Sequence, residues 1–268
     1  MPSPPPHGRV TRGKTAPGRL GPLDAYVARY ERGLLQRRDG PWSAAPFVDV
    51  GFGERPWTTL ESAEAFRAVA PELRVVGVEI AAPRAEAARV WSEPPRTRFI
   101  QGGFELGGLG AVRLIRAMNV LRQYRVEEVG RAHRRLGERL LEGGALLEGT
   151  SDKHGQALAA HLMRRRADGL RREALLVATD FSRGFAPLLF RDVLPRDLRR
   201  RVAPGDPMHA LFSAWTAAWE AVRGDLGPAA AFKRSVQALA CRVPGVATDP
   251  WLLERGVMRW SPPGGVPR

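Results

Sequence analysis

A glycine-rich turn and an acid one strand later are the residues whose types and spacing point to chemistry. Segment 47–59 reads FVDVGFGERPWTT, an apolar run that breaks at Gly51 and Gly53. Glycines there let a ligand approach main-chain N–H groups without a Cβ in the way. The β-branched stretch 74–79 ends in Glu79, a carboxylate that can accept from both hydroxyls of a ribose. The pattern predicts a nucleoside site, although short glycine motifs also occur in ordinary strand-to-helix turns.

The elements around this turn predict an α/β fold. Apolar runs predict strands at 47–50, 74–79, 97–101, 112–118, 145–148, 174–180 and 187–192. Helical spacing predicts helices at 23–38, 58–69, 81–91, 126–140, 155–166, 207–222 and 229–241. The short turn at 182–184 requires its two strands to be antiparallel. We therefore expect a doubly wound, seven-stranded Rossmann-like sheet whose last strand is antiparallel, with an N-terminal helical arm and a C-terminal helical addition.

Asp49-x-Gly51-x-Gly53, followed one strand later by Glu79, resembles the class I S-adenosylmethionine (SAM)-dependent methyltransferases. Together with RGKT at 12–15, GGFEL at 102–106, NVLRQY at 119–124 and EGT at 148–150, this loop makes the chain similar to one bacterial branch of that class. The resemblance covers about 46–193. A nicotinamide dehydrogenase is the competitor, but its fingerprint needs a glycine where Pro56 stands.

The resemblance implies SAM as cofactor and methyl transfer to an oxygen or nitrogen of an acceptor that it does not identify. The alternative is a SAM- or nucleic-acid-binding protein with this fold and no turnover. The implied cofactor-binding residues are Asp49, Gly51, Phe52, Gly53, Glu79, Ile80, Gly103, Phe104, Ala117 and Asn119. Gly103 stands where the family usually has an acid, and Arg55 where it has a third glycine. No catalytic residue is assigned, because methyl transfer needs no obligatory nucleophile or metal.

The acceptor is expected near the ends of the fourth and fifth strands. Asn119 and Tyr124 follow the fourth predicted strand, whereas Glu148, Thr150 and Ser151 end or follow the fifth. Because the methyl group would point toward those two strand ends, these polar side chains are expected to ring the acceptor pocket.

Composition limits the partners. The net charge is +14, from 42 Lys and Arg against 28 Asp and Glu. Such a charge suits RNA as a partner, but an arginine-rich composition can also reflect codon bias, and both interpretations stay open. The single cysteine, Cys241, and five scattered histidines give no metal-ligand spacing. No apolar run reaches the roughly 18 residues of a membrane span, so a cytoplasmic protein is expected.

Three parts of the chain are expected. Residues 1–22 are expected to form a flexible basic arm, and residues 23–203 the methyltransferase domain with its leading helix. Residues 204–268 are expected to form a helical extension with an irregular tail. Trp215 and Trp219 lie at helical spacing in that extension, which is more typical of core packing than of an acceptor wall. If the arm orders over a bound ligand, deleting 1–22 leaves SAM affinity nearly intact and lowers methyl transfer.

Overall fold

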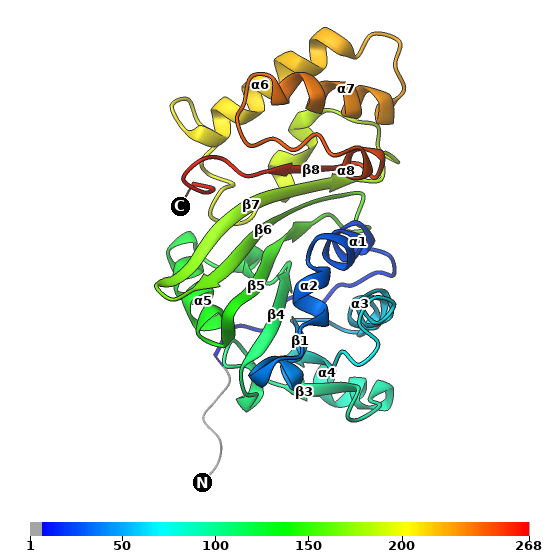
Figure 1. Ribbon diagram of the computed structural model, residues 1–268, viewed down its shortest axis with the longest axis vertical. Coiled ribbons are helices and arrows are strands. Elements are labelled where there is room, and N and C mark those ends of the chain that lie inside the picture. Colours follow the sequence, from blue (N-terminus) through cyan, green and yellow to red (C-terminus); the bar gives the residue numbers. More distant parts are fainter. Residues whose placement is uncertain (1–6, 268) are drawn as a thin grey trace.

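Eight strands form one sheet in the order β3-β2-β1-β4-β5-β6-β7-β8, with helices on both faces (Figure 1). The computed structural model describes residues 7–267. The strands are β1 (Phe47–Val50), β2 (Val75–Glu79), β3 (Thr97–Gln101), β4 (Val112–Met118), β5 (Leu140–Ser151), β6 (Ala157–Arg166), β7 (Gly169–Thr179) and β8 (Val257–Trp260). The α-helices are α1 (Gly21–Tyr30), α2 (Arg32–Gln36), α3 (Trp57–Arg67), α4 (Ala82–Ala87), α5 (Val126–Glu138), α6 (Pro207–Val222), α7 (Pro228–Ala240) and α8 (Pro250–Glu254). The 3-10 helices are η1 (Gly40–Ser43), η2 (Ala88–Trp91), η3 (Leu106–Gly108), η4 (Leu121–Gln123) and η5 (Pro187–Val193).

The first five strands are parallel. β1 pairs with β2 and β4, β2 with β3, and β4 with β5. Every residue of β1, β2 and β4 is buried, as expected for strands that are covered on both faces. The carboxyl ends of β1, β2 and β4 meet at one edge, which is where open α/β sheets bind ligands.

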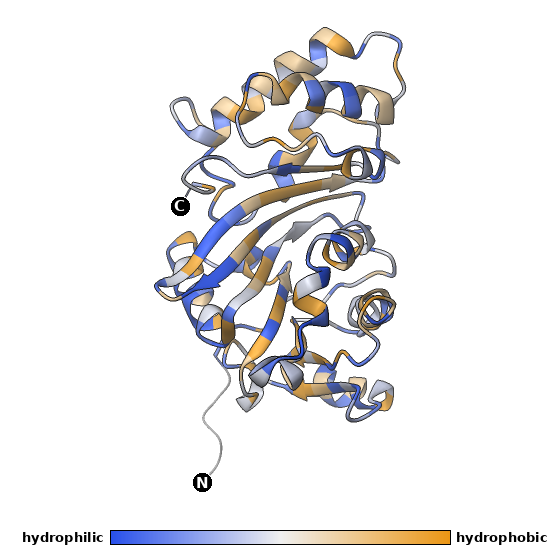
Figure 2. Ribbon diagram, in the orientation of Figure 1, coloured by the Kyte–Doolittle hydropathy of each residue, from blue (hydrophilic) through white to orange (hydrophobic). Residues whose placement is uncertain are grey.

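Alternate residues of the central strands form two cores. Phe47, Leu114 and Leu147 pack on the face covered by α1 and α3. Val48 and Ile115 pack on the opposite face with residues of α5. Figure 2 shows that β6 and β7 are apolar over much of their length and hydrophilic at the ends that contain the arginines of 164–166 and 171–172.

The expected α/β Rossmann-like fold is confirmed, but the sheet has eight strands instead of seven and its last part is connected differently. The pairs β5–β6, β6–β7 and β7–β8 are all antiparallel. Segment 155–166, expected as a helix, contains β6, and 187–192, expected as the last strand, lies in η5. The tail after Val243, expected to be irregular, supplies α8 and β8.

Packing explains these differences. β6 contains good helix formers, but Ala160 and Leu162 pack on one face while Ala159 and Met163 pack on the other. A segment that is apolar on both sides and lies between two strands is stabilised more by packing in the sheet than by the small free energy of helix propensity. In η5, Pro187 has no N–H for a ladder, which argues against a central strand.

The C-terminal addition shares a core with the sheet. Residues of α6 and α7 pack against Leu175 and Val177 of β7. Trp215 is fully buried, stacks on Phe190 at 5.5 Å between ring centroids, and donates from Nε1 to Ser235 Oγ at 3.1 Å. The expectation that Trp215 is a core residue is confirmed. None of the helices within residues 7–267 is long and apolar enough to cross a membrane.

Trp215→Ala should lower the free energy of unfolding by about 3–5 kcal/mol, because it empties a fully buried site and leaves the Ser235 hydroxyl without its donor. Urea denaturation followed by circular dichroism measures this. Trp219→Ala is the matched control, since Trp219 lies one turn further along α6 and is partly exposed. Equal losses in the two variants would contradict the central role of Trp215.

Candidate functional site

The described part of the N-terminal arm, residues 7–20, lies across the carboxyl edge of the sheet. Phe104 N donates to His7 O at 2.8 Å, and Glu54 N donates to Gly13 O at 2.8 Å. Further along, Gly18 N donates to Glu61 Oε1 at 2.8 Å. The arm therefore runs from the turn after β3 past the glycine loop to α3.

The turn after β3 binds the arm through main-chain groups and one carboxylate. Glu105 accepts from His7 N at 2.8 Å and from Gly103 N at 2.6 Å. Burial alone would raise the pKa of Glu105, but these two N–H groups hold it below its usual value. An ionised acid is therefore present on this turn, two residues after Gly103.

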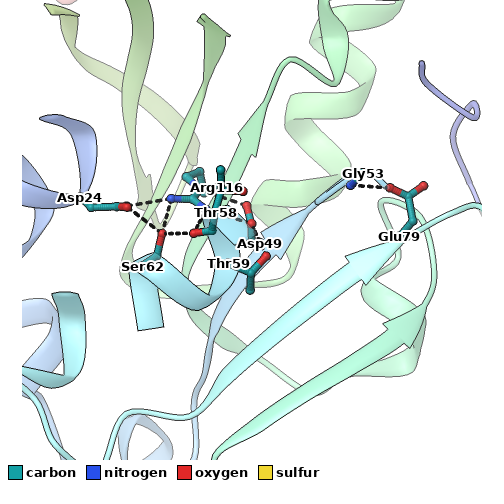
Figure 3. Close-up of polar contacts among 8 residues, drawn as sticks. All are labelled: Asp24, Asp49, Gly53, Thr58, Thr59, Ser62, Glu79 and Arg116. Atoms are coloured by element: carbon teal, nitrogen blue, oxygen red, sulfur yellow. Dashed lines mark hydrogen bonds and ion pairs between the residues drawn. The ribbon is translucent and has the colours of Figure 1, made fainter. Parts of the chain in front are cut away.

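Glu79 joins the end of β2 to the glycine loop. Its side chain is 1% exposed, and one of its oxygens accepts from Gly53 N at 3.0 Å (Figure 3). The other oxygen accepts from Ala81 N at 3.0 Å. The Arg84 guanidinium lies 4.0 Å from it and also donates to Thr11 O of the arm at 3.0 Å. Each carboxylate oxygen keeps a second lone pair for a ligand hydroxyl.

The glycine loop needs its glycines for conformation and for space. Gly51 and Gly53 have φ angles of +75° and +86°. A Cβ on Gly51 would collide with Val120, and one on Gly53 would collide with the carbonyl oxygen of Gly13. The loop is thus a cradle that a segment of the protein's own main chain approaches closely.

Asp49 is held by a buried arginine. Arg116 Nε and Nη2 donate to its two oxygens at 3.0 and 2.9 Å, and Thr59 Oγ1 donates to Oδ2 at 2.6 Å (Figure 3). Arg116 Nη1 also donates to Asp24 Oδ1 at 2.7 Å. Asp49 therefore fixes the glycine loop from beneath instead of offering a free carboxylate to a ligand.

Two carboxylates share this one guanidinium. Burial raises the pKa of Asp24 to about 7, although Arg116 and Ser62 act in the opposite direction. Burial would lower the pKa of Arg116, but Asp49 and Asp24 raise it. Because Oδ1 accepts from Arg116, a proton on Asp24 lies on Oδ2, which is 2.9 Å from Ser62 Oγ and can donate to it, while the serine hydroxyl donates to Thr58 O at 2.7 Å. The cluster is then electrically neutral.

Asn119 links the ends of β4 and β5. Its φ is +63°, its Nδ2 donates to Ser151 Oγ at 3.0 Å, and Ser151 N donates to its Oδ1 at 3.0 Å. Arg19 Nε donates to the same Ser151 hydroxyl at 2.7 Å. Both the predicted site residue and the end of the arm are thus anchored on Ser151.

The predicted cofactor residues divide between two spaces. Five line a cavity of about 520 Å³: Asp49, Gly51, Phe52, Gly53 and Asn119. Glu79, Ile80, Gly103 and Phe104 line a gap of only about 20 Å³ with His7 and Gly8. The arm therefore fills most of the expected nucleoside site. Ala117 lines neither space and belongs to the core beneath α5.

The expected acceptor residues do not form one ring. Tyr124 lies in the narrow gap, where its hydroxyl oxygen accepts from Arg9 N at 2.5 Å. Thr150 is buried and does not line the large cavity. Only Asn119 lines it, while Ser151 lies just behind Asn119.

Glu148 belongs to a separate buried cluster. It lies 3.2 Å from His133 Nε2, and His161 Nε2 lies 3.0 Å from Asp197 Oδ1. Glu148, His161 and Asp197 offer ligand atoms within 4.8 Å of one another. The rings of His133 and His161 lie 6.2 Å apart between centroids, so two histidines that are distant in the sequence meet in space. Arg172 also pairs with Asp197, so a guanidinium already balances part of the acidic charge.

Sequence reasoning missed Arg116, Glu105 and the arm's main chain. A charge inside the apolar run of β4 was the available signal for Arg116. Glu105 stands two residues after Gly103, within reach of the same turn. The arm's contacts use backbone groups, so no side-chain pattern pointed to them.

No protein-family model matches the sequence, and no curated protein matches it. Among solved structures, the chain is similar to the mitomycin 7-O-methyltransferase, with 20% identity over 49% of this chain and 36% of that chain and a TM-score of 0.34. It is also similar to the CcbJ methyltransferase from Streptomyces caelestis, with 19% identity over 62% and 72% of the two chains and a TM-score of 0.38. A third is the magnesium protoporphyrin IX methyltransferase from Synechocystis PCC 6803 with bound SAH, with 16% identity over 50% and 55% and a TM-score of 0.37. The chain spans less than two thirds of two of these three, and we take its function from its own site.

Asp24→Asn should remove a pH dependence of stability. Because its folded pKa of about 7 lies above the usual value of 3.8, Asp24 contributes stability that is complete below about pH 4. This contribution is lost as the pH rises through 7, by at most about 1.4 kcal/mol per pH unit. The unfolding free energy of the wild type minus that of the variant should therefore fall between pH 4 and 7 in urea titrations.

Asp39→Asn is the control for this prediction. Asp39 is exposed, and its hydrogen bond from Arg37 lowers its pKa, so its contribution has the opposite sign. A wild-type minus Asp24→Asn difference that is flat or rises with pH would mean that both buried acids stay ionised.

Proposed function

We propose that this chain is a class I SAM-dependent methyltransferase that methylates an oxygen or nitrogen of an acceptor beside the glycine loop. The turn 103–105 is the observation that supports this most. There, Phe104 N donates to the peptide of His7, and Glu105 accepts from it. An adenine edge carries the same pair of groups, an acceptor ring nitrogen beside a donor amine. The arm's peptide thus marks a turn that is suited to a nucleobase.

The residues around this turn fit the rest of a nucleoside. Glu79 is a buried carboxylate with lone pairs left for the ribose hydroxyls. Gly51 and Gly53 leave the loop open to close main-chain contact, as the approach of Gly13 illustrates. We assign Glu105 to the adenine amine, Phe104 N to the ring, and Asn119 to the methionine end.

Bound SAM would supply a methyl group activated by a sulfonium. The acceptor's lone pair would form the new bond to carbon as the carbon–sulfur bond breaks, and that bond's electron pair would stay on a neutral thioether. The protein's part would be to align the acceptor, whose proton would pass to water. Asn119 is suited to positioning because Ser151 fixes both ends of its amide.

The proposal places the enzyme in the cytoplasm. Cys241 is free and exposed, which is typical of a reducing compartment. Formation of S-adenosylhomocysteine from SAM, with fractionated lysate as the source of acceptor, is the direct test. Binding of SAM without turnover in any fraction would favour a binding protein with this fold.

Glu79→Gln should weaken SAM binding by about 1–3 kcal/mol, because the amide loses the charge that strengthens hydrogen bonds from the ribose. Calorimetric titration with SAM measures this. Glu54→Gln is the control, since Glu54 is exposed on the same loop. Undiminished binding by Glu79→Gln would remove Glu79 from the site.

Deleting residues 1–13 should strengthen SAM binding several-fold, whereas the sequence alone led us to expect nearly unchanged affinity on deleting 1–22. The reason is that residues 7–13 occupy the donors and acceptors assigned to the nucleoside. Deleting residues 1–6 is the control, because it keeps every contact that residues 7–13 make. Equal SAM affinity in the two truncated proteins would show that the arm and the nucleoside do not compete.

A further inference from the structure

The 520 Å³ cavity beside the glycine loop is lined by an unusual number of cations. Its charged lining contains six of them: Arg12, Lys14, Arg19, Arg122, Lys153 and Arg199. Among the residues that the structure describes, the side chains of Arg12, Lys14, Arg122 and Lys153 make no hydrogen bond or ion pair. Every one of the six except Arg12 lies outside the arm segment 7–13, so the charge persists if that segment moves.

Acidic groups offset little of this charge. Asp49 and Asp152 are the acids in the lining. Asp49 is neutralised by Arg116 at 2.9 Å. Asp152 accepts from the main-chain N–H groups of His154 and Gln156 at 3.2 and 2.9 Å, and lies 3.6 Å from Arg183. Arg199 pairs with Asp192 at 3.5 Å, but that carboxylate is 90% exposed.

The pKa of Arg19 is lowered by burial and in part by a neighbouring positive charge of the same cavity. Its guanidinium is buried and bonded to Ser151 Oγ and Lys14 O, at 2.7 and 2.8 Å. Burial lowers its pKa most, Asp152 opposes this, and the neighbouring charge of Arg122 lowers it further. Like charges held close together in a partly enclosed space are stabilised by an anion that bridges them.

We infer that this cavity binds a phosphate group, and that the methyl acceptor is a phosphorylated molecule. The statement about the methyl acceptor rests on the proposed function, because methyl transfer takes place in this cavity only if SAM binds beside it. Phosphate is favoured over a single carboxylate since a dianion with several oxygens can bridge more than two cations. The phosphate belongs either to a small phosphorylated molecule or to an RNA backbone.

The test is calorimetric titration of the full chain with inorganic pyrophosphate, without SAM and at low salt. Binding is expected, and Arg122→Ala/Lys153→Ala should weaken it about tenfold or more, as expected for lost charged hydrogen bonds. Neither side chain makes a contact that holds the fold, and thermal melting of the variant checks this. Arg131→Ala/Arg134→Ala is the matched control: it removes the same charge from exposed positions on α5 and should change affinity less than about twofold.

No binding of pyrophosphate, or equal weakening in the two double variants, would overturn the phosphate site. A short labelled RNA, titrated in parallel at low and physiological salt, separates the sources. Affinity far above that for pyrophosphate, with a steep salt dependence that shrinks in Arg122→Ala/Lys153→Ala, identifies an RNA backbone. RNA affinity no higher than that for pyrophosphate identifies a small phosphorylated acceptor. A separate titration with SAM alone tests the proposed cofactor. Failure to bind SAM counts against the proposed function, whereas failure to bind pyrophosphate counts against the phosphate site.

Discussion

The buried guanidinium of Arg116 is the interaction on which the ligand edge of this protein depends. It extends from β4 and bonds to Asp49 of β1, Asp24 of α1 and the Thr58 carbonyl of α3. Removing Asp49 would leave this buried charge without its bidentate partner, a change that typically costs several kcal/mol. The glycine loop lies directly between Asp49 and α3, so its position is set by a charge cluster on the side of the sheet away from α5. The protein's own contacts therefore position the loop, independently of any ligand.

The parallel half of the sheet could be predicted from the sequence, whereas the antiparallel half could not. β1 and β4 begin and end where their apolar runs do, because strands that are buried on both faces leave a continuous signal. The sequence signal of β6 is ambiguous. The alanines and leucines at 157–163 are good helix formers, and they also fit a buried strand between two neighbouring strands. The β8 strand is only four residues long and pairs with β7 across some eighty residues of chain, which no local pattern encodes.

The site shows the same limit. Glycine conformations and the acid at the end of β2 follow from local sequence, and Gly51, Gly53 and Glu79 do converge. The partners that decide their roles are distant in sequence: Asp49 and Arg116 are 67 residues apart, and His7 and Glu105 are 98 apart. Asp49 could be interpreted as a loop anchor or a ligand contact until Arg116 was located. The arm was visible only as a basic, proline-rich segment, because it binds through its backbone.

That backbone binding makes an exchange of arm for nucleoside energetically cheap. The N–H of Phe104 and the carboxylate of Glu105 are paired with His7 in this conformation, and the same two groups are suited to an adenine edge. A ligand that replaces His7 therefore leaves neither group without a hydrogen-bond partner. Free energy, about 1 kcal/mol per hydrogen bond, is lost only for arm contacts that the ligand does not replace. Those include the bond from Glu54 N to Gly13 O, the bonds from Arg84 to Thr11 O and Arg12 O, and the contacts of Arg9 with the Tyr124 hydroxyl and with Glu128. The arm can therefore protect a charged, water-accessible site at rest and still yield to a cofactor of ordinary affinity.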